Sequence, residues 1–331
     1  MSRSGPRPTT PDRPGPRRRW AGVLRLGLSL GILAALLWKF DGVEVLSRLG
    51  SIRPEAVVAA IALFVVGQWL NALRWRWILQ PLVAVVPATR FLFRLVMIGS
   101  FFSVLLPTSV GGDVVRAEMS KGFAGGRIPA YTSILACRIM GLLATLTIGA
   151  LALGLATYAY SLGQSAAIAV LLCGAGLVAV ATLALSDRPV IRRIRQHGLR
   201  LVGRFSSELD RVVVALAGQR RMLVAAFALS VLIIVVAMIG TVSVLAAGLG
   251  IAAPMYMHWI AVPVAMVATL LPVSFNGAGI RELVFVILYG RVGVDPASAT
   301  ALGLAFTTLL TLVGLAGGLV LVASRGATAH H

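Results

Sequence analysis

The sequence predicts an all-α polytopic membrane protein with six full spans and two broken or re-entrant helices, arranged as an inverted repeat. The first observation is composition: 58% of the 331 residues are apolar, only 12% are charged, and the mean hydropathy is +0.93. A soluble domain carries about a quarter charged residues. The second is a series of long apolar runs, and the third is a motif that occurs twice. A soluble enzyme, a disulfide-rich secreted scaffold and a disordered chain are therefore excluded.

The hydropathy pattern gives the elements in order. Residues 1–20 are rich in Pro and Arg and predict a disordered, basic cytoplasmic tail. A single transmembrane domain is predicted over residues 21–325, and residues 326–331 form a C-terminal tail. Crossing the hydrocarbon core takes about 20 residues. The apolar runs of about this length or more predict six spans at 23–38, 55–73, 131–157, 165–186, 222–248 and 299–323.

Two further apolar segments are interrupted by Pro and Gly. The segment 91–119 is interrupted at 107–112, and the segment 256–290 at 272–279. We expect discontinuous or re-entrant helices at both places, because Pro breaks a helix and irregular backbone at membrane depth must be buried in protein. The stretch 187–221 alternates arginines with apolar residues at helical spacing. It predicts interfacial helices on the inner leaflet, with a solvated basic loop as the alternative.

The positive charges indicate the orientation. The net charge is +19, but it is unevenly distributed. With a cytoplasmic N-terminus, 23 basic residues fall inside, and the four that fall outside are Arg48, Arg53, Arg281 and Arg291. This asymmetry predicts a multi-pass protein of the cell (inner) membrane with both termini in the cytoplasm. Basic segments beside a membrane contact anionic lipids, and no nucleic-acid partner is expected because no interleaved aromatics or known module accompany them.

The repeated motif is L-P-x-S-x-x-G-x-x-x-R. It covers 106–116 and 271–281, and its five matched positions are all offset by 165 residues. Three full spans lie between the two copies, so the copies approach the membrane from opposite faces. The sequence therefore predicts an inverted repeat, with repeat one at about 21–160 and repeat two at about 161–325. In transporters built this way, the substrate site lies near the midplane where the broken helices meet.

The chemistry of the motif indicates an anion site. Pro107 and Pro272 break the helices, the glycines permit tight turns, and freed amides at a new helix N-terminus attract anions. Arg116 and Arg281 follow within two turns, and the planar guanidinium suits phosphate. The predicted substrate-binding residues are Arg116, Arg281, Ser109, Ser274, Gly111, Gly112, Asn276, Gly277 and Gly279.

A structural role for the same arginines is the alternative. Asp113, Glu118 and Glu282 lie close enough in sequence to gate or neutralise them. Arg138, inside the 131–157 span, is expected to pair with Asp113 or Glu118, since an unpaired charge in hydrocarbon is costly.

Other polar residues carry weaker signals. Gln68, Asn71, Arg74 and Trp75 are expected to make interhelical hydrogen bonds and an aromatic belt, with a functional role as the alternative. Because His197 and His258 stand alone and no hydrolase or nucleotide-binding motif is present, we expect neither a metal, a cofactor nor catalytic residues. The chain is therefore not expected to be an enzyme.

The motifs and the order of spans resemble the flippase-like transmembrane family named after lysylphosphatidylglycerol synthase. The resemblance covers residues 20–325 and is carried by Asn71–Trp75, Leu105–Gly122, the ILACRIMGLL segment and Leu270–Glu282. It implies movement of a lipid between leaflets in a bacterial or archaeal membrane. The family's aminoacyl-phospholipid synthases add a large cytosolic catalytic domain, and since this chain stops at His331 their transferase activity is not expected here.

The leading functional prediction is a lipid translocase that binds an anionic or phosphate-bearing head group between its two broken helices. One alternative is a secondary transporter of a soluble anion or of a polyprenyl-linked sugar phosphate. Another is a non-transporting membrane scaffold for a lipid- or glycan-processing enzyme. Membrane lipids are the expected ligands, and such an enzyme is the possible protein partner.

Overall fold

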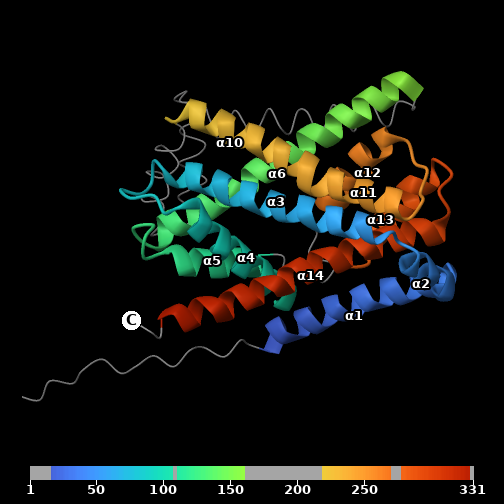
Figure 1. The fold of residues 1–331 in the computed structure, drawn as a ribbon, viewed down its shortest axis with the longest axis horizontal. Coiled ribbons are helices and arrows are strands. Elements are labelled where there is room, and N and C mark those ends of the chain that lie inside the picture. The colour runs from blue at the N-terminus through green and yellow to red at the C-terminus, as the bar shows by residue number, and fades with distance from the viewer. Residues whose placement is uncertain (1–15, 107–109, 161–217, 270–276, 329–331) are drawn as a thin grey trace, which may run out of the picture.

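The computed structural model describes residues 16–106, 110–160, 218–269 and 277–328. The described part of the first half forms the helices α1 (Pro16–Lys39), α2 (Gly42–Gly50), α3 (Pro54–Leu79), α4 (Thr89–Leu105), α5 (Gly111–Ser120) and α6 (Arg127–Tyr160). The described part of the second half forms α10 (Arg220–Ile233), the π-helical η2 (Ile234–Gly240), α11 (Thr241–Gly248), α12 (Met255–Ala268), α13 (Ile280–Gly290) and α14 (Pro296–Thr328). The long helices run lengthwise through the molecule (Figure 1).

Four helices are long and apolar enough to cross a membrane. They are Pro54–Leu79, Arg127–Leu155, Arg220–Gly248 and Pro296–Ser324, and they coincide with four of the six predicted spans. The predicted span 23–38 lies within α1. The predicted span 165–186 and most of the basic segment 187–221 lie outside the described residues, as does most of the N-terminal tail.

Both interrupted segments are split between two helices. The first is divided between α4 and α5, and the second between α12 and α13. Before α13 the backbone takes positive φ at Gly277 (80°) and Gly279 (86°), a conformation that side chains with a Cβ rarely adopt. The backbone amide of Gly279 then donates to Glu282 Oε2 at 2.6 Å, which satisfies one free donor at the start of α13.

Small residues let the helices pack closely. α4 packs along α14, and α6 along α12. A Cβ on Gly317 of α14 would lie 2.0 Å from the carbonyl oxygen of Met97 in α4. α3 meets η2 just as closely, since a Cβ on Gly67 would lie 2.1 Å from that of Ala237. Such contacts are typical of membrane helices, whose association depends on van der Waals packing.

A candidate anion-binding cavity

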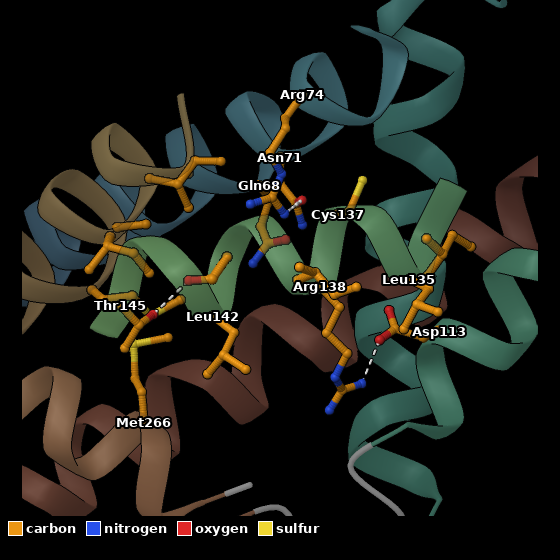
Figure 2. A pocket seen from close by; sticks show the side chains of 18 of the residues that line it. Gln68, Asn71, Arg74, Asp113, Leu135, Cys137, Arg138, Leu142, Thr145 and Met266 are labelled. Atoms are coloured by element: carbon orange, nitrogen blue, oxygen red, sulfur yellow. Dashed lines mark hydrogen bonds and ion pairs between the residues drawn. The ribbon is translucent and has the colours of Figure 1, made fainter. Parts of the chain in front are cut away.

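One cavity of about 440 Å³ lies between the two halves of the chain. Helices α3, α5 and α6 line it from the first half, and α10, η2 and α12 line it from the second. Most of the lining is apolar. The charged residues among its described lining are Arg74, Asp113, Arg116 and Arg138. Figure 2 shows Gln68, Asn71 and Arg74 on one wall, with Arg138 and Asp113 pointing toward each other on another.

Arg74 is a buried cation on α3, and the side chains to which it donates are neutral. Its Nη1 donates to Ser230 Oγ on α10 at 2.9 Å, and its Nη2 donates to Asn71 Oδ1 at 2.7 Å. The bond to Ser230 is interhelical, as the sequence predicted for this patch. Gly141 of α6 packs beside the guanidinium, and a Cβ there would be in ordinary van der Waals contact with Nη1, at 3.4 Å.

Arg116 is positioned by α3, α4 and its own helix, α5. Its guanidinium lies over the ring of Trp75, 4.5 Å from the centroid, and that ring is fixed by a 3.0 Å bond from its Nε1 to Ser133 Oγ. Gly99 of α4 makes room for the side chain, since a Cβ there would lie 2.4 Å from Arg116 Cδ. A cation over an aromatic face gains electrostatic attraction even where water is excluded.

Arg74 and Arg116 both retain guanidinium N–H groups that make no hydrogen bond to a described residue. Arg74 is 8% exposed and Arg116 is 7% exposed. Three of their nitrogens, Nε of Arg74 and Nε and Nη2 of Arg116, have no hydrogen-bond acceptor among the described residues. A buried donor without a partner costs about 1–3 kcal/mol, so these two side chains still have hydrogen-bonding capacity that their described neighbours do not use.

Asp113 is the carboxylate that contacts both Arg138 and Arg116. Its Oδ2 accepts from Arg138 Nη1 at 2.7 Å, and its Oδ1 lies 3.4 Å from Arg116 Nη1. Of the two partners that the sequence offered for Arg138, the structure places Asp113 beside it. The side chains of Asp113 and Arg138 are about 30% exposed, at 28% and 32%, so this pair lies at the accessible part of the cavity.

Glu118 lies apart from these arginines. It accepts hydrogen bonds from Lys121 and Tyr131 and lies 3.4 Å from Arg127, where the chain turns from α5 into α6. The hydrogen bonds from Lys121 and Tyr131 hold the pKa of its carboxyl below the usual value. The sequence suggested that Glu118 contacts Arg116 or Arg138. In the structure it contacts Lys121, Arg127 and Tyr131 instead.

The second motif forms a separate cluster. Arg281 donates from Nη1 to Thr307 Oγ1 at 2.7 Å, and its guanidinium lies 5.4 Å from the centre of the Phe306 ring. Thr307 in turn donates to Oε1 of the fully buried Glu282 at 2.5 Å. Arg281, Gly277 and Gly279 are not among the described residues that line the cavity.

Of the other predicted site residues, two lie at the start of α5 and five lie outside the described residues. Gly111 and Gly112 begin α5, and Gly112 packs against Gly99 and Ser103 without lining the cavity. Pro107, Ser109, Pro272, Ser274 and Asn276 lie outside the described residues. Among the described residues, no group of three His, Cys, Asp or Glu side chains could hold a metal ion.

The α3 wall of the cavity was not predicted as part of the site. Gln68, Asn71 and Arg74 all line it. They are spaced three residues apart, which places them on one side of a largely apolar helix. This spacing is the sequence feature that could have predicted a polar wall. Sequence alone could not show that α5 and α6 would present Arg116 and Arg138 to the same space.

Comparison with known proteins adds two matches. Residues 22–318 match the family model described as the lysylphosphatidylglycerol synthase TM region. The glycosyltransferase AglD of Haloferax volcanii is 29% identical over 361 aligned residues, which cover 93% of this chain and 55% of AglD. The chain thus spans about half the length of this curated relative. No solved structure matches the chain.

Proposed function

Because the chain belongs to the lysylphosphatidylglycerol synthase transmembrane-region family, we propose that this multi-pass membrane protein is a lipid translocase. Its cavity binds the phosphate-bearing head group of a lipid and lets it pass between leaflets. The protein moves its ligand without making or breaking covalent bonds, in the cell membrane, with both termini in the cytoplasm.

The observation that carries the proposal is the composition of the cavity. Three arginines from three helices and one carboxylate converge in a largely apolar space of about 440 Å³. Arginine forks bind phosphate oxygens, and apolar walls accommodate the beginning of an acyl or prenyl chain. Charged residues inside membrane segments are costly and mark substrate pathways when they face a cavity.

An inverted repeat would give the cavity access from both leaflets. Under the predicted correspondence, α4 and α6 of the first repeat match α12 and α14 of the second. Reciprocal packing supports this, because α4 packs on α14 as α12 packs on α6, and α5 packs on α6 as α13 packs on α14. The α3–α4 and α5–α6 connections also lie at the opposite end of the molecule from the α13–α14 connection (Figure 1).

In this proposal the two motifs act at different stages. Arg116 binds the phosphate in the conformation described here. Arg281 is its counterpart in the second repeat and is held by Thr307 beside Glu282. It takes over the head group when the opposite side of the repeat opens, and the two arginines are therefore both required.

The test is a lipid-translocation assay with the full-length protein reconstituted into vesicles that contain a fluorescent, phosphate-bearing lipid. We expect Arg116→Gln and Arg281→Gln each to lower the translocation rate by about tenfold or more, because a charge-assisted hydrogen bond is worth about 1.5–3 kcal/mol. Arg291→Gln, which removes an exposed arginine outside the cavity, is the matched control. Full activity in both the Arg116→Gln and the Arg281→Gln variants would refute the proposal.

A lipid-linked sugar phosphate is the second candidate ligand. It is supported by the match to a protein named a glycosyltransferase, which suggests a glycan-processing context and a glycan-processing enzyme as partner. Vesicles that contain a prenyl-linked sugar phosphate distinguish it from a glycerophospholipid. Translocation of the former alone would select this candidate.

A further inference from the structure

We infer that the cavity selects a head group with two negative charges, as in a phosphate monoester or a diphosphate, over the single charge of a phosphodiester. The inference rests on the proposed function and specifies the chemistry of its ligand. It is carried by the charge balance of the cavity and by the two buried guanidinium groups among its lining residues.

The charge balance leaves two guanidinium groups unmatched. Among the described lining residues, three arginines face one carboxylate. Asp113 is closer to Arg138 (2.7 Å) than to Arg116 (3.4 Å), and the hydrogen-bond partners of Arg74 are the neutral Ser230 and Asn71. Among the described residues, Arg74 thus contacts no carboxylate, and Arg116 shares Asp113 with Arg138. In a poorly hydrated space, a ligand with two negative charges neutralises both.

The unused donors point to the same chemistry. Nε of Arg74 and Nε and Nη2 of Arg116 are three buried guanidinium nitrogens without acceptors among the described residues, and they belong to two side chains that line the cavity. A phosphate monoester has three terminal oxygens, whereas a phosphodiester has two. The monoester therefore offers one more charged acceptor oxygen to the guanidinium groups that line the cavity, and its second charge strengthens their hydrogen bonds to it.

The remaining lining favours a lipid as the source of this phosphate. Ile134, Leu142 and Met266 are among the apolar side chains around the arginines. They provide a surface for the first carbons of a chain attached to the head group, which a small soluble phosphate would leave unfilled.

The test compares two lipids that differ in one methyl group. Dioctanoyl phosphatidic acid is a monoester, and dioctanoyl phosphatidylmethanol has the same chains and phosphate but carries one charge. Binding of each to the purified full-length protein in detergent is titrated calorimetrically. We expect phosphatidic acid to bind about tenfold more tightly or better, since the extra charge adds one or more charge-assisted hydrogen bonds.

Variants connect this preference to the two arginines. Arg74→Gln and Arg116→Gln should each reduce the affinity ratio toward one, whereas Arg291→Gln should preserve it. Arg116→Lys keeps the charge and should keep part of the ratio. The comparison of the two lipids on the unaltered protein requires no variant to fold.

The outcomes separate this inference from the proposed function. Equal affinity for both lipids, with both weakened by Arg116→Gln, overturns the inference and leaves the translocase proposal standing. Glycerol phosphate binding as tightly as phosphatidic acid supports the selection of a dianion but assigns the site to a soluble anion and refutes the lipid function. Absence of any arginine-dependent binding overturns both.

Discussion

At the scale of single residues, we expect Asp113 to set how strongly the proposed site attracts an anion. Its carboxylate lies 2.7 Å from Arg138 and 3.4 Å from Arg116, so it competes with a phosphate for the same cations. We predict that Asp113→Asn raises the affinity for phosphatidic acid by about tenfold, because a charge-assisted contact of this kind is worth about 1.5–3 kcal/mol. The same variant should release its lipid more slowly and translocate it less often.

Calorimetric titration and the vesicle assay measure the two effects of Asp113→Asn. Glu118→Gln is the control, because Glu118 is a carboxylate on the same helix that contacts Lys121 and Arg127 and does not line the cavity. Weaker binding by Asp113→Asn would show that Asp113 holds the arginines in place and does not compete with the ligand.

At the scale of helices, glycines set the distance between α4 and α14. A Cβ on Gly317 would lie 2.0 Å from the backbone oxygen of Met97, which cannot rotate away as a side chain can. We predict that Gly317→Ala forces the two helices apart and lowers the free energy of unfolding by about 1–3 kcal/mol, the usual cost of overpacking. Thermal unfolding in detergent measures the change.

Gly122→Ala is the matched control for this helix contact. Gly122 lies in the turn after α5 and has no atom within 4 Å of the position that a Cβ would occupy. An unchanged midpoint for Gly317→Ala, equal to that of the control, would mean that α4 and α14 are not in tight contact in the membrane.

At the scale of the whole molecule, the proposed translocation depends on the orientation of the chain in the membrane. The positive-inside pattern predicts that the turn at Lys121 is cytoplasmic and that Arg291 is external. In a background with Cys137 and Cys173 replaced by Ala, Arg291→Cys should react with an impermeant maleimide in intact cells. Lys121→Cys should react only after permeabilisation, and the reverse labelling pattern would invert the topology.

The sequence by itself determined the class of protein. Its apolar runs placed four helices that the structure shows to be long enough to span a membrane, and its motifs carried the family resemblance that the match over residues 22–318 confirms. Pro and Gly located both helix interruptions. These features are local, because hydropathy and helix breaking depend on residues close together in the chain.

Only the tertiary structure decided which residues form the cavity. It brings Arg74, Arg116 and Arg138 to one space, assigns Asp113 to Arg138 and Arg116, and places Glu118 and Arg281 with other partners. The three arginines come from three helices, and their meeting depends on contacts such as Gly67 with Ala237 and Gly99 with Arg116. Helix packing of this kind is set by the fit of distant surfaces, and no local pattern in the sequence encodes it.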